Sequence, residues 1–512
     1  MRGFVFIMFF LRNAFKNKKY FKRFALAIAA VLFALVFFSI FAVFACKKGA
    51  NDKKRENGLY EMTLELCENT LKGDFVYSEK ANLSGDSECF VFCLQPNYLS
   101  GGTEREKGSE SESGDGAERV GENEQKSLMK ITNDFGGDFS YLNGGAYIKT
   151  GAKTKNGLKS AHLSFELALP HGNDRLSVTE TGINLANFYP YICDYDEKTG
   201  WAINEKTSVG DPFSCRVADY KIEFTVKSTY TVAGAAPAFC DVRGEKTVYG
   251  YDLKNYTQAA FCLSENFEVI SKKSGNRSIN CYYVKNYGQN YAEKQNADFY
   301  EKSLSLAVGA LCFFEKNYGE YPRESYSIAF VPFFCGGMEY PALSFVSANQ
   351  NVENSIKAIV HETAHQWFPL TVVNDEFSEG YFDEGLAEFM TYKYFCLKLP
   401  DYGKKMLDSA AKTVKTYTDN VCKDMRMNKR LCEFSGEYEY YAVAYARGLI
   451  LFCECEKVSG EKKFAARLKN FYAENAYCRI SASDFADSLN ERTKKVFYAI
   501  VDSKAVLCLP NK

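Results

Sequence analysis

The stretch Ala358-Ile-Val-His-Glu-Thr-Ala-His-Gln-Trp367 is the most informative part of this chain, and Glu384 follows its second histidine after eighteen intervening residues. Positions i and i+4 of a helix share one face, so His361 and His365 can present their imidazoles to a single ion. Glu362 lies between them in sequence, where it can hold a water molecule, and Glu384 supplies a third ligand from a second helix. Three protein ligands leave the fourth tetrahedral position open, which suits a catalytic rather than a structural zinc. The pattern therefore predicts one catalytic Zn2+ ion.

A chance match to this pattern is the alternative, and the rest of the sequence weakens it. Only four histidines occur in 512 residues, and two of them fall at this spacing. The helix is mostly apolar, and Pro369 is expected to stop it. An apolar, buried helix that carries two histidines and a glutamate is unfavourable unless those groups are paired or bound to a metal.

The N-terminus predicts a membrane attachment. Residues 1–23 contain a cluster of lysines and arginines, and residues 24–45 are uncharged. As a helix, the uncharged segment spans about 33 Å, enough to cross the hydrocarbon core of a bilayer. We expect a basic cytoplasmic segment, a transmembrane anchor over residues 24–45, and an extracytoplasmic catalytic domain. The alternative is a lipoprotein signal with Cys46 as the lipid acceptor, and the sequence leaves this choice open.

Composition excludes some functions. The formal net charge of -1 gives no sign of a polyanionic partner, and the chain has no nucleic-acid-binding motif. Eighteen cysteines in an exported protein are compatible with disulfides. Many of them stand in apolar runs, where they are also typical of small buried side chains. The disulfide pattern and the oligomeric state stay open.

Hydrophobic periodicity indicates a multidomain α+β protein. After a linker over residues 46–58, residues 59–270 alternate apolar and polar side chains and predict an N-terminal β-domain. Residues 100–127 within it are rich in Ser, Gly and Glu and predict a disordered insertion. Residues 271–460 predict an α/β catalytic domain, and residues 461–512 a short helical C-terminal segment.

Four elements are expected around the histidine motif. The pattern predicts a helix over residues 299–318, a buried strand over residues 326–334, and a second strand over residues 343–346. A helix over residues 382–394 is expected to carry Glu384.

Four motifs resemble those of the aminopeptidase N family, zinc aminopeptidases of the gluzincin type that also include leukotriene hydrolases. The motifs are Gly336-Gly-Met-Glu-Tyr340, His361-Glu-Thr-Ala-His365, Tyr381-Phe-Asp-Glu-Gly-Leu-Ala-Glu388 and Tyr445-Ala-Arg-Gly448. The resemblance runs from about residue 144 to residue 460. It implies a saddle-like β-sheet domain followed by a thermolysin-like zinc catalytic domain, and removal of single residues from peptides with a free N-terminus.

The resemblance also implies roles for individual side chains. Glu362 is expected to take a proton from the metal-activated water and pass it to the leaving amine. Tyr445 is expected to donate a hydrogen bond to the tetrahedral oxyanion. Glu388, one turn after Glu384, is expected to accept a hydrogen bond from a zinc-bound histidine; the alternative for it is a solvent-exposed glutamate.

The Gly-Gly-Met-Glu motif is expected to bind substrate. The resemblance implies that Glu339 pairs with the free α-amine of the peptide, from a strand that also carries Gly336, Gly337 and Met338. Both glycines allow close approach of a peptide backbone.

The chain departs from the family's commonest pattern at three positions. Gly337 stands in place of alanine, Tyr340 in place of asparagine, and Asp383 in place of asparagine. The preferred N-terminal residue is therefore open. The large helical C-terminal domain of longer relatives is expected to be missing or reduced, which predicts a more open site.

Two other functions are compatible with the motif. A thermolysin-like endopeptidase uses the same ligands, although Glu339 and Tyr445 argue against it. A catalytically silent binding protein on the cell surface is disfavoured by the intact ligand set. An epoxide-hydrolase side activity, known in one branch of the family, cannot be judged from these residues, and the physiological substrate is also open.

Overall fold

The computed structural model describes residues 57–85, 88–100, 128–135, 138–212, 216–287, 297–421 and 424–504. Residues 57–512 belong to one compact unit. The predicted membrane anchor lies outside the described residues, as does the predicted insertion except for Ser100, which ends helix α3 (Gln95–Ser100). Within the described ranges, no helix is both long and apolar enough to cross a membrane.

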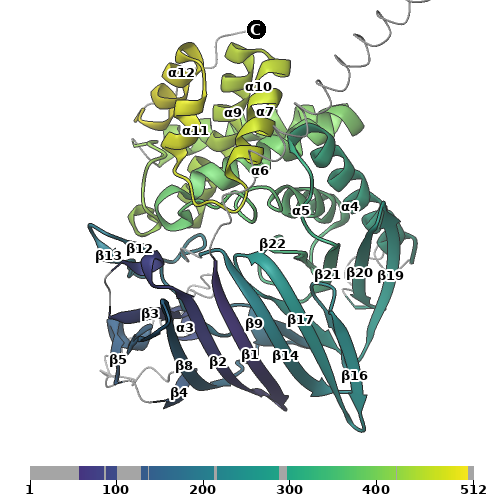
Figure 1. Ribbon diagram of the computed structural model, residues 1–512. Coiled ribbons are helices and arrows are strands. Elements are labelled where there is room, and N and C mark those ends of the chain that lie inside the picture. Colours follow the sequence, from purple (N-terminus) through teal and green to yellow (C-terminus); the bar gives the residue numbers. More distant parts are fainter. Residues whose placement is uncertain are drawn as a thin grey trace, which may run out of the picture. The chain divides into compact units, whose positions relative to one another are not determined.

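An eight-stranded sheet dominates the N-terminal half (Figure 1). Its strands run in the order β16-β17-β14-β1-β2-β8-β4, with β7 paired to β8. They are β1 (Gly58–Cys67), β2 (Thr70–Lys80), β4 (Met129–Asp134), β7 (Lys153–Lys155), β8 (Leu158–Ala168), β14 (Ala218–Lys227), β16 (Phe239–Arg243) and β17 (Lys246–Tyr256). Burial alternates along β1 and β14, so one face of the sheet lies on the core. The strands expected from alternation are confirmed.

Three smaller sheets complete this half of the chain. One has the order β15-β18-β10-β9, another β11-β3-β6-β5, and a third pairs β12 with β13. Their strands are β3 (Cys89–Leu94), β5 (Phe139–Leu142), β6 (Tyr147–Gly151), β9 (Leu176–Val178), β10 (Ile183–Leu185), β11 (Pro190–Ile192), β12 (Tyr195–Asp196), β13 (Gly200–Trp201), β15 (Thr231–Ala233) and β18 (Phe261–Ser264).

A five-stranded sheet of order β19-β20-β21-β23-β22 supports the candidate site. It consists of β19 (Phe267–Ser274), β20 (Arg277–Val284), β21 (Ser325–Val331), β22 (Gly337–Tyr340) and β23 (Leu343–Ser347). Strand β22 lies at the edge and pairs antiparallel with β23. Helices α4 (Ala297–Tyr318) and α5 (Val352–Ala364) pack on this sheet and on each other. The predicted helix over residues 299–318 and the strand over residues 343–346 are confirmed.

The remaining helices gather beyond the five-stranded sheet, away from the eight-stranded one (Figure 1). They are α6 (Glu376–Lys398), α7 (Pro400–Asn420), α8 (Glu437–Tyr440), α9 (Arg447–Ser459), α10 (Glu461–Asn475), α11 (Ala482–Ser488) and α12 (Glu491–Val501). A single hydrophobic cluster extends from β20 to α12 and includes Trp367, Phe452 and Phe485. This shared core fixes the helices that carry the site against the sheet.

Candidate metal centre

Helix α5 positions the two histidines of the motif. Its N-cap is Asn351, whose side-chain oxygen accepts a hydrogen bond from the backbone N–H of Asn354 at 2.8 Å. The fully buried Ile359 and Val360 fix the rotation of the helix against the core. The helix ends at Ala364, earlier than the proline that was expected to stop it, and His365 is its C-cap.

Helix α6 supplies Glu384 and is bent near its start. Glu379 has non-helical backbone angles, φ -139° and ψ 34°, so the first turn of α6 departs from the axis of the rest. The helix predicted over residues 382–394 is confirmed, and it begins six residues earlier, at Glu376. Glu376 and Glu384 therefore lie on two differently oriented parts of one helix.

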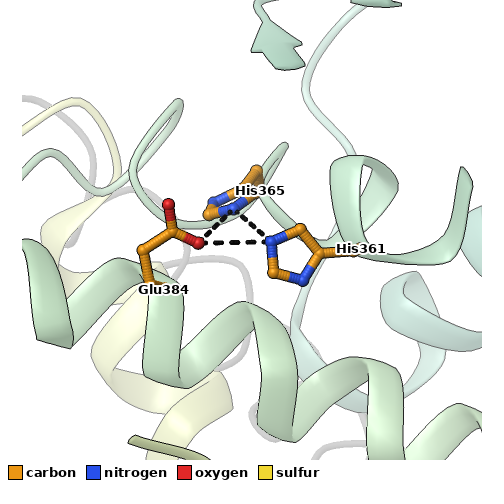
Figure 2. Close-up of side chains that lie close together, drawn as sticks. All are labelled: His361, His365 and Glu384. Carbon is orange, nitrogen blue, oxygen red and sulfur yellow. Dashed lines mark hydrogen bonds and ion pairs between the residues drawn. The ribbon is translucent and has the colours of Figure 1, made fainter. Parts of the chain in front are cut away.

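The structure brings His361, His365 and Glu384 together (Figure 2). Nε2 of His361 lies 3.0 Å from Nε2 of His365, and Oε2 of Glu384 lies 3.2 Å and 3.3 Å from these two nitrogens. Ligand atoms around a tetrahedral zinc with bonds of about 2.0–2.1 Å are separated by about 3.3 Å. The triangle therefore has the dimensions of three zinc ligands, with all three side chains buried.

The Nδ1 atoms of both imidazoles have polar partners outside the triangle, which leaves the Nε2 atoms within it as acceptors. Nδ1 of His365 lies 2.8 Å from the carbonyl oxygen of Phe368, to which it donates. Nδ1 of His361 lies 3.2 Å from Oε1 of Glu388. Protons on these two nitrogens leave lone pairs on both Nε2 atoms, and these face each other and a carboxylate. A cation between them removes the repulsion, so the donor set fits a metal ion.

Glu388 is buried, and it is paired on its other side with a lysine. Oε1 of Glu388 lies 2.8 Å from Nζ of Lys357, which is four residues before His361 on α5. Burial raises the pKa of Glu388, but Lys357 and His361 outweigh this effect and hold the pKa at about 2. Glu388 is therefore a fixed anion behind His361. The sequence analysis missed Lys357, although its i, i+4 spacing from His361 was a visible signal.

Glu362 lies beside the triangle with a free oxygen. It is 5% exposed, and its Oε2 has no hydrogen-bond partner among the described residues. Burial raises the pKa of Glu362 to about 8. Gly337 of the edge strand packs directly on this carboxylate, because a Cβ at Gly337 would lie 2.5 Å from its Oε1. Absence of a side chain at residue 337 thus leaves room for Glu362.

Tyr445 reaches the ligands from a π-helical turn, η5 (Tyr441–Ala446). Its hydroxyl donates a short hydrogen bond to Oε1 of Glu384, and its ring stacks on His361 with centroids 5.9 Å apart. Burial raises the pKa of Tyr445 well above its usual value, so the hydroxyl remains a donor. Turns of this kind occur often at functional sites.

Glu339 lies on β22, close to the triangle but outside it. It is 6% exposed, and no other side chain among the described residues forms a hydrogen bond or ion pair with its carboxylate. Carboxylate oxygens of Glu339 and Glu362 and a ring nitrogen of His365 lie within 4.8 Å of one another. Burial raises the pKa of Glu339 to about 7.

The other residues of the Gly-Gly-Met-Glu motif shape the edge of the sheet. The carbonyl oxygen of Gly336 accepts hydrogen bonds from the side chain of Gln350 at 2.9 Å and from the backbone of Ser347 at 3.0 Å. Met338 pairs with Phe345 on β23 and packs against a neighbouring apolar cluster. Among the described strands, β22 pairs with β23 alone, so its other edge forms no ladder with a described strand.

Further acidic residues that the sequence analysis did not single out approach Glu339. Carboxylate oxygens of Asp211, Glu339 and Glu376 lie within 4.8 Å of one another. Asp383, which stands where the family's commonest pattern has asparagine, accepts a hydrogen bond from the side chain of Asn374 at 2.7 Å. Burial raises its pKa well above the usual range.

Comparison with known proteins shows which family the part of the chain around the triangle resembles. Residues 300–503 match a family model described as the peptidase family M1 domain. This stretch is thus similar to M1 peptidase domains. Aminopeptidase 2 of Candida albicans is 26% identical over 221 residues, which are 40% of this chain and 24% of that protein. Human aminopeptidase B is 26% identical over 191 residues, 34% of this chain and 28% of that protein.

The chain thus spans about a quarter of the length of these curated relatives. An M1 zinc metallopeptidase from Deinococcus radiodurans has a similar structure, with a TM-score of 0.59 and 14% identity. The alignment covers 89% of this chain and 96% of that one, so the two share a fold beyond the M1 domain. The family and the mixed multidomain fold expected from the motifs are confirmed.

Proposed function

We propose that this chain is a zinc-dependent aminopeptidase that hydrolyses the first peptide bond of peptides with a free N-terminus. One observation carries the proposal: a buried triangle of His361, His365 and Glu384 has zinc-ligand dimensions and lies beside the buried carboxylates of Glu362 and Glu339. The M1 domain and its aminopeptidase relatives support the same activity.

The ligand triangle fits zinc better than magnesium or calcium. Two neutral imidazoles and one carboxylate are a common catalytic zinc set, whereas magnesium and calcium prefer oxygen ligands. When bound there, Zn2+ supplies a Lewis acid that polarises a carbonyl group and lowers the pKa of water towards about 7.

Glu362 is the general base in this proposal. Its Oε2 is buried without a partner, so it is free to accept a proton from the attacking water. Its raised pKa favours this uptake and lets the same carboxyl deliver the proton to the leaving amine. Gly337 keeps the carboxylate in place against the edge strand.

Tyr445 stabilises the negative charge that forms on the carbonyl oxygen. Its hydroxyl already points at the ligand triangle, where it donates to Glu384. A carbonyl oxygen placed over the triangle can accept this hydrogen bond instead. The donor is oriented before the reaction, which is the condition for effective oxyanion stabilisation.

Glu339 makes the enzyme an exopeptidase. A buried carboxylate without a side-chain partner favours a ligand that brings its own positive charge. The α-ammonium of a free N-terminus supplies that charge, while an acetylated or internal residue leaves Glu339 unpaired. An extended peptide can run along the outer edge of β22 with its N-terminus at Glu339.

The decisive experiment compares leucine p-nitroanilide with N-acetyl-leucine p-nitroanilide, using the zinc-loaded full chain with and without a chelator. We expect hydrolysis of the free amine substrate alone, and loss of activity when zinc is removed. Equal cleavage of both substrates would indicate a thermolysin-like endopeptidase. Stoichiometric zinc with no hydrolysis of any peptide would indicate a silent binding protein.

We also propose that the chain is attached to a membrane, with its catalytic part outside the cytoplasm. The support is the basic segment over residues 1–23 and the uncharged segment over residues 24–45. Membrane fractionation of the full chain and of a truncation that begins at Asn57 tests the attachment. Loss of attachment in a Cys46→Ala variant would favour a lipoprotein over an uncleaved anchor.

A further inference from the structure

A second group of acidic side chains includes Glu339 but neither Glu362 nor His365. Its members are Asp211, Glu339 and Glu376, and each offers a carboxylate oxygen within 4.8 Å of the others. They come from three places in the fold: the loop after β13, the edge strand β22, and the first turn of α6. We call this group the acidic trio.

The loop that carries Asp211 is held rigidly in place. Gly210 has a φ of 65°, and a Cβ there would lie 2.6 Å from Leu431 and 3.1 Å from Tyr440. The buried guanidinium of Arg175 forms a close ion pair with Asp211. The carboxylate of Asp211 is therefore fixed by two independent contacts and is neutralised by Arg175.

Glu339 and Glu376 are not neutralised in this way. Neither carboxylate forms a hydrogen bond or ion pair with another side chain among the described residues, and Glu339 is 94% buried with its carboxylate in the trio. Two ionised carboxylates at this distance repel each other unless one takes up a proton or positive charge is placed near both. Asp211 and Glu376 are partly exposed, so a ligand can supply that charge from solvent.

The charges of Glu339 and Glu376 indicate what kind of ligand the acidic trio binds. Under the proposed function, on which this inference rests, the α-ammonium of the substrate neutralises Glu339. A second cation, close to the first residue of the substrate, would then stabilise the ionised form of Glu376. An N-terminal lysine or arginine carries such a second cation on its own side chain.

We propose that the acidic trio is a cation-binding specificity site that selects peptides with an N-terminal arginine or lysine, and that Glu376 binds the side-chain cation. Asp211, whose charge Arg175 already balances, borders this site and supplies a further carboxylate oxygen near Glu376. The guanidinium group of arginine can engage two carboxylates at once, because it has several donors in a planar fork.

Arginine p-nitroanilide and citrulline p-nitroanilide are the matched test substrates, since citrulline has nearly the same shape without the charge. We expect kcat/KM of the zinc-loaded full chain to be at least about tenfold higher for arginine, as for a charged hydrogen bond in a partly buried site. Equal values for the two substrates would overturn the proposal.

Glu376→Gln tests the assigned residue. This isosteric change is expected to bring the ratio of arginine to citrulline kcat/KM close to one. The matched control is Glu474→Gln, which removes the same charge from an exposed position on α10 and should keep the wild-type ratio. A Glu376→Gln protein that melts at the wild-type temperature and keeps the arginine preference contradicts the assignment.

Two outcomes separate this inference from the proposed function. Cleavage of citrulline p-nitroanilide without any arginine preference leaves the aminopeptidase intact and removes the specificity site. If no anilide is hydrolysed, the proposed function is wrong. The specificity site is then tested by calorimetry with argininamide and citrullinamide. Equal affinities for the two amides would overturn the specificity site. Calcium or magnesium that raises the melting temperature of wild type but not of Glu376→Gln would show a metal site instead.

Discussion

Gly385 of α6 and Gly448 of α9 meet backbone to backbone where the two helices cross. A Cβ on Gly385 would lie 2.9 Å from the Cα of Gly448, and a Cβ on Gly448 would lie 2.6 Å from the Cα of Gly385. Gly385 directly follows the candidate ligand Glu384, and Gly448 follows Tyr445 by three residues. Close contact between the helices thus sets the distance at which the tyrosine hydroxyl reaches Glu384.

Gly448→Ala is expected to push these helices apart. Neither backbone can yield locally, so we expect a loss of about 1–3 kcal/mol in the free energy of unfolding. The change should also lower kcat, because Tyr445 moves with α9. Thermal and urea unfolding measure the first effect. Gly151→Ala is the control, since no atom lies within 4 Å of a Cβ at residue 151; equal stability of the two variants would contradict the role of the crossing.

Glu362→Gln should separate metal binding from catalysis. The amide cannot accept the proton of water, so we expect kcat to fall by about 10²–10⁴-fold, as is usual for loss of a general base. Glu362 is not one of the three ligands, and zinc content measured by mass spectrometry should stay at one ion per chain. Glu353→Gln, at an exposed position on the same helix, is expected to keep wild-type kcat. Full activity in Glu362→Gln would exclude it as the base.

Glu388 and Lys357 should control zinc affinity through His361. Glu388→Gln removes the anion that lies 3.2 Å from Nδ1 of His361, and we expect zinc to bind about 10–100-fold more weakly. Lys357→Met leaves Glu388 in place but removes the cation that lowers its pKa. Burial then raises the pKa of Glu388, so the zinc affinity of this variant should fall further below that of wild type as pH decreases. Competition with a fluorescent chelator at several pH values measures both effects, and unchanged zinc affinity in both variants would contradict this role.

Gly337→Ala is expected to displace the base. The new Cβ would lie 2.5 Å from Oε1 of Glu362, so the carboxylate has to move. A misplacement of about 1 Å in a catalytic group can reduce kcat by roughly 100-fold. At Gly336 a Cβ meets only the side chain of Gln350, at 3.5 Å, and Gly336→Ala should reduce kcat much less. Similar kcat values for the two alanine variants would show that the Glu362 side chain can move aside without loss of catalysis.

The sequence predicted that the two motif histidines share one helix face, because helix geometry acts over short distances. The i, i+4 spacing of His361 and His365 puts both on one face of α5, and the structure closes the triangle with Glu384. The same rule would have identified Lys357. Strand alternation predicted the strands of the β-half but could not give their order, since β1 pairs in parallel with β14 about 160 residues later.

The acidic trio could not be predicted from sequence. Asp211 and Glu376 stand in segments without periodicity or a motif, and 128 residues separate Asp211 from Glu339. Only the packing of the loop at Gly210 against Leu431, and the kink of α6 at Glu379, bring them together. Contacts of this kind depend on tertiary structure, which local patterns do not encode.

Glu339 should determine the acidic limb of the pH profile. Burial raises its pKa to about 7 from the usual 4.5, so the carboxyl is protonated over a wider pH range than an exposed glutamate. An α-ammonium group binds the ionised form, and kcat/KM for leucine p-nitroanilide should therefore fall as pH decreases through about 7. Above about pH 8 the α-amine of the substrate loses its own proton, which predicts a bell-shaped profile.

Glu339→Gln distinguishes this carboxyl from Glu362, whose pKa is also raised by burial. The amide cannot titrate, so the acidic limb that belongs to Glu339 should vanish, and kcat/KM should fall by about 10–100-fold because one charged hydrogen bond is lost. The ratio of kcat/KM for N-acetylated substrates to kcat/KM for substrates with a free amine should rise, since the variant no longer prefers a cation. An unchanged acidic limb in Glu339→Gln would assign that limb to Glu362 and leave the α-amine contact without support.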